Sequence, residues 1–227
     1  MISAVNYINR KFKGLIIKVR SRYYTSKITS GNGQIIIINP FVKFRIIKAE
    51  GAQFIVNGKF LISSHLGGNS PIYIELGKSS IFQIDGDFAV GHGVTILVNE
   101  GGELYIGGKD KESNSGITCD TTIMVYKKVK IGKDFLCAWD VFISDSDWHH
   151  IDGQSHQADV LISDHVWVAH KSSILKGTAI GKGCIVASHS KLINKTFPEH
   201  SLIGGTPAKI LKTSVNWCRD IEDNANK

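Results

Sequence analysis

The sequence predicts an all-β solenoid, because aliphatic residues recur with a period of six and small, polar or glycine residues separate them. A period of six fits neither the 3.6-residue repeat of an α-helix nor the two-residue repeat of a strand, and it is typical of hexapeptide-repeat solenoids. Three hexads would form one triangular coil of about 18 residues, with each aliphatic side chain pointing into the prism. The clearest run is Ile162, Val168, Ile174, Ile180, Val186 and Leu192.

At the N-terminus we expect a basic amphipathic arm, residues 1–34, in which residues 2–24 are helical. The first 30 residues hold seven basic side chains and no acidic one, so the formal charge of +7 belongs to the arm and the rest of the chain is balanced. We expect the arm either to pack on the solenoid end or a neighbouring subunit, or to make a peripheral contact with the inner membrane. A balanced body predicts no nucleic-acid partner. The apolar helical stripe consists of Val5, Ile8, Phe12, Leu15, Ile16 and Val19.

The solenoid domain is expected over residues 35–206. Residues 35–106 alternate apolar runs with glycine, which predicts less regular coils. The period of six returns from Val125 to Ile143, and its phase breaks before Ile162. The polar segment near 144–161 is therefore expected to be a loop that leaves the solenoid wall, and residues 107–116 predict a second excursion. Residues 207–227 predict a C-terminal segment, which consists of a short return segment and helix followed by a fraying tail.

The cysteines and the first residues of the chain bear on the cellular compartment of the protein. The four cysteines are scattered and form no C-x-x-C pair, so we expect buried thiols in a reducing compartment. The first residues lack the apolar run and cleavage site of a secretory signal, and no stretch of about 18 uncharged apolar residues predicts a transmembrane helix. These features favour a cytoplasmic protein, and the basic arm is compatible with peripheral association with the inner membrane.

The residues with the clearest chemical potential lie in the expected loop. His149 and His150 follow Asp145 and Asp147 closely. A histidine whose one ring nitrogen is held by a carboxylate or a carbonyl can take a proton at the other nitrogen, as a general base does. On the residues alone, this signal is weak, because histidines and aspartates often share an exposed surface without any catalytic role.

The sequence resembles the left-handed parallel β-helix hexapeptide acyltransferases, especially the sugar O-acetyltransferases. The match covers about residues 125–212 and is carried by VLISDHVWVAHKSSILKGTAIGKGCIVASHSKLI at 160–193, HSLIGGTPAKILK at 200–212 and FISDSDWHHI at 142–151. The resemblance implies a left-handed parallel β-helix that assembles as a homotrimer. It also implies an acyl-coenzyme A-dependent O-acyltransferase, most simply one that transfers acetyl to a sugar hydroxyl of a bacterial surface polysaccharide or its precursor.

By the same resemblance, His149 is the general base, because it has the family's spacing of an acidic residue, any residue and a histidine. Asp147 or Asp145 would orient it, and His150 is its rival. Acetyl-coenzyme A would act as co-substrate in a groove between two subunits. Its pantetheine would follow main-chain groups one coil apart, and its phosphates would meet lysines. The implied cofactor-binding residues are Ala169, His170, Ala187, Ser188, Lys195, Lys209 and Lys212.

Trp139 and Trp148 flank this region in the sequence, and an aromatic ring can stack on the apolar face of a sugar. We expect Trp148, with His150 and Trp139, to contact the glycan acceptor. Packing between coils or at a subunit contact is an equal alternative for Trp139.

Other functions remain as alternatives. His165 and His170 form an H-x4-H pair like that of the solenoid carbonic anhydrases, but catalytic zinc needs a third protein ligand, and neither His65 nor His92 has suitable spacing. We therefore expect no metal. An N-acetyltransferase of an amino nucleotide-sugar and a non-catalytic solenoid scaffold are the alternatives to the O-acyltransferase.

Overall fold

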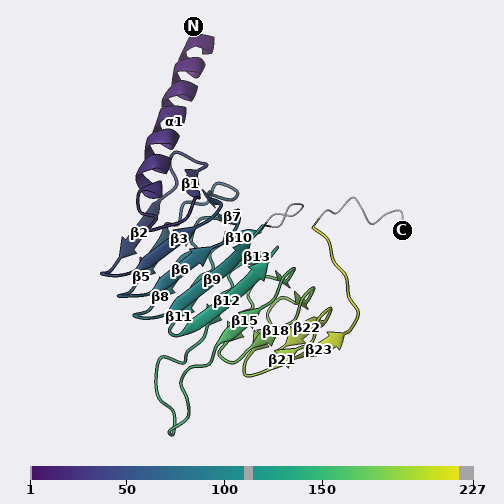
Figure 1. Ribbon diagram of the computed structural model, residues 1–227. Helices are drawn as coiled ribbons and strands as arrows, with labels where there is room; N and C mark the ends of the chain where they lie inside the picture. The colour runs from purple at the N-terminus through teal and green to yellow at the C-terminus, as the bar shows by residue number, and fades with distance from the viewer. Residues whose placement is uncertain (1, 110–114, 220–227) are drawn as a thin grey trace, which may run out of the picture.

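The protein folds as one triangular β-solenoid that carries a helix at its N-terminal end (Figure 1). The computed structural model describes residues 2–109 and 115–219. Apart from an antiparallel pair at the C-terminal end, each strand pairs in parallel with the strand one coil further along the chain, so three flat sheets enclose a common core. The expected second excursion at 107–116 lies partly outside the described residues. A strand ends at Gly108 and the next begins at Gly116.

The strands are distributed regularly over the three sheets. Sheet I contains β1 (Gln34–Ile37), β4 (Lys59–Ile62), β7 (Phe88–Val90), β10 (Gly116–Cys119), β13 (Leu136–Trp139), β16 (Trp167–Val168), β19 (Ile185–Val186), β22 (Leu202–Gly205) and β23 (Ala208–Lys212). Sheet II contains β2 (Phe44–Lys48), β5 (Ile72–Leu76), β8 (Thr95–Val98), β11 (Thr122–Val125), β14 (Phe142–Ser144), β17 (Ser173–Leu175) and β20 (Lys191–Leu192). Sheet III contains β3 (Gln53–Val56), β6 (Ile81–Ile84), β9 (Glu103–Gly108), β12 (Lys128–Lys133), β15 (Val160–Ile162), β18 (Ala179–Ile180) and β21 (Thr196–Phe197).

The period of six in the late coils arises because each short strand there directs one aliphatic side chain of the repeat into the core. The six aliphatic residues from Ile162 to Leu192 are each 3% exposed or less, which confirms the predicted repeat. On sheet II the strand register stacks inward residues into one column, and all of them are fully buried. That column runs through Ile74, Ile96, Ile123, Ile143, Ile174 and Leu192.

The early coils are longer and wider than the late ones. Ile74 and Ile96 are register partners 22 positions apart, whereas Ile174 and Leu192 are 18 apart. Phenylalanines fill the wider part of the core, and the rings of Phe54 and Phe82 stack with their centroids 5.2 Å apart. The less regular coils expected from the sequence are therefore real coils whose corners carry extra residues.

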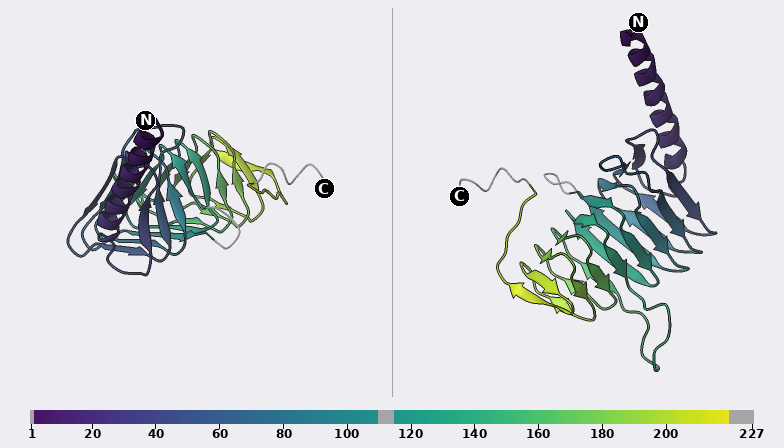
Figure 2. Two further views of the ribbon diagram at one scale, coloured as in Figure 1. Left: turned by 90° about the horizontal axis from the view of Figure 1, so that it is seen from above. Right: turned by 180° about the vertical axis from the view of Figure 1, so that it is seen from behind.

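Both ends of the chain leave the repeat. The helix α1 (Ile2–Thr25) confirms the predicted N-terminal helix, and it projects from the solenoid as a rod (Figure 2). No helix within the described residues is long and apolar enough to cross a bilayer. The return segment expected after Pro207 is β23, which folds back on β22 as an antiparallel strand. The short helix expected after it is wrong for the described residues, because residues 213–219 form no helix.

The thiols mostly follow the sequence-based expectation. Cys119, Cys137 and Cys184 are buried, whereas Cys218 is exposed. Burial raises the pKa of the Cys137 thiol to about 12, because no water is available to solvate a thiolate there. Cys137 is therefore a core side chain.

Candidate active site

A long loop, residues 145–159, leaves the solenoid at the corner between sheets II and III, as the sequence predicted. It connects β14 to β15 and hangs away from the body (Figure 1). Antiparallel bridges join its two arms, at Ser146 with Gln157 and at Ile151 with Gln154. The Asp147 amide donates to the His156 carbonyl at 2.8 Å, so the loop is an ordered ribbon at its base.

Asp145 holds the base of this loop. Its carboxylate is fully buried and accepts three backbone N–H bonds from the preceding coil, from Tyr126 at 2.7 Å, Lys127 at 2.7 Å and Lys128 at 2.6 Å. Such charge-assisted bonds fix the loop where it leaves the wall. Both carboxylate oxygens are thereby occupied away from solvent, which corrects the expectation that Asp145 orients the catalytic histidine.

Asp147 is paired with a lysine of the next coil. Its Oδ2 lies 2.5 Å from the Lys176 Nζ, and the same Nζ donates to the Ser155 carbonyl at 2.8 Å. Lys176 is only 9% exposed, and it touches both arms of the ribbon. Asp147 therefore holds the loop through Lys176, and the structure gives it this contact in place of the expected direct bond to a histidine.

The three histidines of the loop occupy different surroundings. His149 is exposed, and among the described contacts its side chain has no hydrogen bond or ring partner. His150 meets His156 edge-on with ring centroids 4.7 Å apart, and the His156 Nδ1 lies 3.1 Å from the Ser146 Oγ. Sequence reasoning missed His156, although it lies in the same polar segment. Tyr126, whose ring contacts His156, comes from the preceding coil.

Trp148 forms part of the packing at the base of the loop. Its indole Nε1 donates to the Ser144 Oγ at 3.2 Å, and its ring meets that of Tyr126 edge-on. It also lines a groove of about 220 Å³ on sheet II, next to Leu97 and Met124. Trp148 is thus half-buried beside a surface groove.

A second group of expected site residues lies at another corner, between sheets I and II. Ala169 and His170 follow β16, and Ala187 and Ser188 follow β19 one coil later. The Ser188 Oγ lies 3.0 Å from the His170 Nδ1. The stacking of the coils places these four residues side by side at this corner.

Trp139 lies at the same corner. Its ring stacks on His170 with centroids 5.5 Å apart, and His170 in turn meets His189 edge-on at 5.1 Å. Trp139 therefore packs between coils, beside the expected coenzyme A groove and away from the protruding loop. The rings of Trp139, His170 and His189 thus form a continuous row at this corner.

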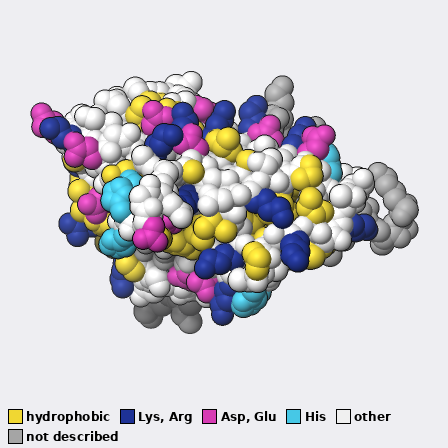
Figure 3. Space-filling model, turned by 90° about the horizontal axis from the view of Figure 1, so that it is seen from below, with side chains coloured by type: hydrophobic (Ala, Val, Ile, Leu, Met, Phe, Trp, Pro, Cys, Tyr) yellow, Lys and Arg dark blue, Asp and Glu magenta, His cyan; other side chains and the backbone are white. Residues whose placement is uncertain are grey.

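Several lysines lie near the C-terminal end of the solenoid. Lys195 and Lys209 line a groove of about 150 Å³ together with Lys191, which sequence reasoning did not select. Phe197 and Pro207 form apolar parts of the same groove. Lys212 lies at the end of β23 and is not part of this lining. Basic side chains lie among apolar ones on the face from which the loop projects (Figure 3).

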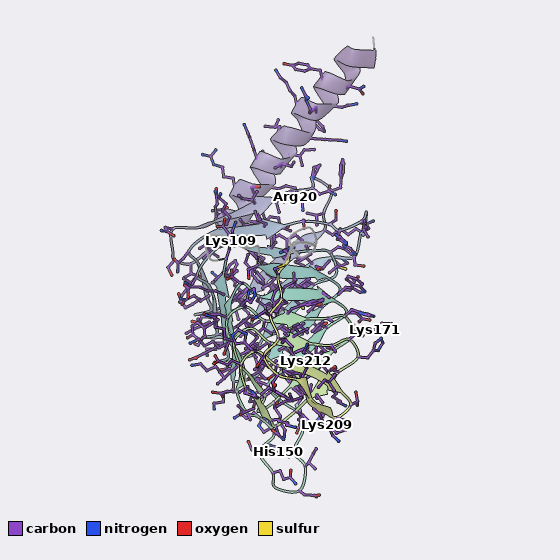
Figure 4. The ribbon with its side chains drawn as sticks, turned by 90° about the vertical axis from the view of Figure 1, so that its right-hand side faces the viewer. Arg20, Lys109, His150, Lys171, Lys209 and Lys212 are labelled. Atoms are coloured by element: carbon purple, nitrogen blue, oxygen red, sulfur yellow. The ribbon has the colours of Figure 1, made fainter. Side chains whose placement is uncertain are left out.

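The two groups of site residues are separated within one chain. The loop, Lys176 and Lys195 belong to the corner between sheets II and III, whereas Ala169 and Ala187 belong to the corner between sheets I and II. Figure 4 shows His150 on the loop and Lys171 at a different edge of the prism. One chain alone therefore does not bring the loop histidines to the expected pantetheine groove.

His165 and His170, the pair behind the zinc alternative, each have other partners within the chain. His165 stacks flat on Trp217, with ring centroids 4.2 Å apart, and its Nε2 faces the Trp217 carbonyl at 3.1 Å. A different trio, His92, Cys119 and Asp120, lies close together. However, the His92 Nδ1 accepts the His65 amide at 3.1 Å, which leaves the proton on Nε2, and Nε2 faces Asp120. Burial also raises the pKa of the Cys119 thiol to about 11.

The fold and the loop define a class of protein, the hexapeptide-repeat acyltransferases, and comparison with known proteins agrees. A polysialic acid O-acetyltransferase of Neisseria meningitidis is 31% identical over 166 residues, which cover 69% of this chain and 75% of that protein. The chain therefore belongs to the hexapeptide-repeat acyltransferase family.

Other relatives match over shorter parts. A polysialic acid O-acetyltransferase of Escherichia coli is 34% identical over 97 residues, which cover 40% of this chain and 31% of that protein. With three of the curated relatives the chain spans only 31% to 50% of their length. The crystal structure of the polysialic acid-specific acetyltransferase NeuO covers 80% of this chain and 92% of its own, with a TM-score of 0.53 and 21% identity, and it confirms the left-handed β-helix fold. No family model matches the sequence.

Proposed function

We propose that this protein transfers an acyl group, most simply acetyl, from coenzyme A to a sugar hydroxyl of a bacterial surface polysaccharide or its precursor. The observation that carries the proposal is the protruding loop, which is held at its base by Asp145 and by the Lys176–Asp147 pair and which presents His149 to solvent. The polysialic acid O-acetyltransferases among the relatives support a glycan acceptor.

In the proposed reaction His149 takes the proton from an acceptor hydroxyl. The oxygen then attacks the thioester carbonyl carbon, and backbone N–H groups stabilise the oxyanion that develops. When the tetrahedral intermediate collapses, the carbon–sulfur bond breaks and the thiolate of coenzyme A receives the proton from His149. The products are the acetyl ester and free coenzyme A, and the histidine is restored.

We propose that the working enzyme is a homotrimer in which the loop of one subunit faces the pantetheine groove of the next. The separation of the two groups of site residues onto different corners of one chain supports this arrangement. The exposure of His149 supports it as well, since a general base works best where bulk water is excluded. The lysine groove at Lys195 and Lys209 would then take the phosphates of coenzyme A.

We place this enzyme in the cytoplasm, at the inner surface of the membrane, where acetyl-coenzyme A and lipid-linked glycan precursors are both within reach. The basic composition of residues 2–24 supports this location.

The proposal is tested by incubating the full chain with acetyl-coenzyme A and a panel of sugars, nucleotide-sugars and glycan fragments. We expect thiol release that depends on one class of acceptor, and a product heavier by one acetyl group. If an amino sugar is acetylated instead, and the rate climbs with pH towards the pKa of the amine, the N-acetyltransferase alternative is correct. No thiol release and no thermal stabilisation by coenzyme A would indicate a non-catalytic scaffold.

A further inference from the structure

The helix α1 is attached to the solenoid by one side only. The Arg20 guanidinium donates to the carbonyls of Pro40 and Val42, both at 2.6 Å. The Ser21 Oγ accepts the Ile37 amide at 2.9 Å, and the Tyr24 hydroxyl donates to the Phe44 carbonyl. These contacts lie in the last turns of the helix, near the position of Arg20 in Figure 4. The first turns extend past the end of the solenoid (Figure 2).

Four large side chains on one side of the helix, Phe12, Leu15, Val19 and Tyr23, form an exposed stripe that faces away from the body. Phe12 is 63% exposed, Leu15 and Val19 are each 59% exposed, and Tyr23 is 56% exposed. At 3.6 residues per turn, the mean direction of these four side chains lies about 140° from that of Arg20, Ser21 and Tyr24. The solenoid therefore cannot cover this stripe, because it contacts the opposite side of the helix.

The charges beside the stripe indicate which kind of surface binds it. The helix carries six basic residues and no acidic one, and five of the six remain exposed while Arg20 is held by the body. Lys11, Lys18 and Arg22 lie along one edge of the stripe. A second copy of the helix would bring six more positive charges with no carboxylate to pair with them, although the spacing of three and four also suits a coiled coil. An anionic surface would neutralise the charges and bury the stripe together.

We propose that α1 binds anionic phospholipid bilayers, lying in the interfacial region with Phe12, Leu15 and Val19 inserted among the acyl chains. Lys11 and Lys18 extend their ammonium groups to the lipid headgroups while their methylene stems follow the helix into the interface. The contacts of Arg20, Ser21 and Tyr24 then hold the solenoid at a fixed attitude to the membrane. This inference deepens the proposed location, and it depends on no step of the acetyl transfer.

The test is co-sedimentation of the full chain with vesicles, without acetyl-coenzyme A. We expect binding to vesicles of equal parts phosphatidylglycerol and phosphatidylcholine, none to phosphatidylcholine alone, and release in about 1 M NaCl, where the Debye length falls to about 3 Å. The double variant Lys11→Gln/Lys18→Gln should weaken the partition coefficient about 25-fold, at about fivefold per charge. The matched control Lys59→Gln/Lys78→Gln, on the body, should leave it unchanged.

A second pair of variants tests the stripe. Leu15→Gln should weaken binding, whereas Leu66→Gln, which changes an even more exposed leucine on a solenoid corner, should not. Equal binding to neutral vesicles, or unchanged binding by the Lys11→Gln/Lys18→Gln variant, would overturn the proposal. So would a fall in oligomer mass for the Phe12→Gln/Leu15→Gln/Val19→Gln variant in light scattering, because the stripe would then be a subunit interface. Because no acyl transfer is measured, failure here leaves the proposed reaction standing.

Discussion

Lys176 reaches from one coil of the solenoid to the base of the loop that leaves the coil before it, and its Nζ lies 2.5 Å from the Asp147 Oδ2. The Lys176 side chain is 11% exposed and that of Asp147 is 28% exposed, so the pair is partly shielded from water. Two positions further on the chain reaches His149. The pair therefore sets the direction in which the loop presents its histidines.

Lys176→Met should lower kcat while it leaves the KM for acetyl-coenzyme A nearly unchanged, because the lysine groove near the C-terminus is untouched. A loss of between about tenfold and a hundredfold in kcat is expected from misplacing the base. Hydrogen exchange should report the cause, since the amides of Asp147 and Ala158, which bond across the ribbon, should exchange faster. Lys176→Arg should restore part of the activity, and Lys182→Met is the matched control on another corner. An unchanged kcat in Lys176→Met would contradict the positioning role.

Asp145→Asn should destabilise the protein, because an amide cannot accept the three backbone N–H bonds that the carboxylate accepts and its NH2 group would face a donor. We expect a loss of about 2–4 kcal/mol in the free energy of unfolding. Urea unfolding of the variant beside the parent chain measures this. If the variant kept the stability of the parent chain but lost activity, Asp145 would act in the reaction itself and not only in holding the loop.

Lys195→Gln/Lys209→Gln tests the proposed phosphate contacts. With acetyl-coenzyme A as donor we expect KM to rise about tenfold, in keeping with two exposed ion pairs lost. With S-acetylpantetheine, which lacks the phosphates, KM should not change. Lys78→Gln serves as the control for general surface charge. Equal effects on both donors would mean that these lysines act on the fold or on the pantetheine arm.

The sequence and the structure agree most closely where the determinants are local. The six aliphatic residues from Ile162 to Leu192 fill successive faces of late coils, so their spacing is visible in the sequence itself. In the early coils the spacing is obscured, because corners of varying length separate register partners such as Ile96 and Ile123, which lie 27 positions apart. After Pro207 the chain returns as β23, which pairs with β22, and within the described residues the helix expected after this return does not form at 213–219.

The site was only partly predictable for a related reason. Its contacts join residues one coil apart, and loop lengths that the sequence does not reveal decide which residues stack. Lys176 lies 29 positions after Asp147, and the backbone partners of Asp145 lie about one coil before it. The short distance in sequence between the aspartates and the histidines therefore pointed to this loop. It did not reveal that Asp145 bonds to backbone amides and that Asp147 pairs with Lys176.

The central claim, that His149 is the base of an acetyltransferase, is tested most directly by acceptor-dependent thiol release from acetyl-coenzyme A in His149→Ala beside His150→Ala. The account predicts that release falls by at least about a hundredfold in His149→Ala and persists in His150→Ala, with thermal stabilisation by coenzyme A intact in both. Undiminished release in His149→Ala, or loss confined to His150→Ala, would contradict it.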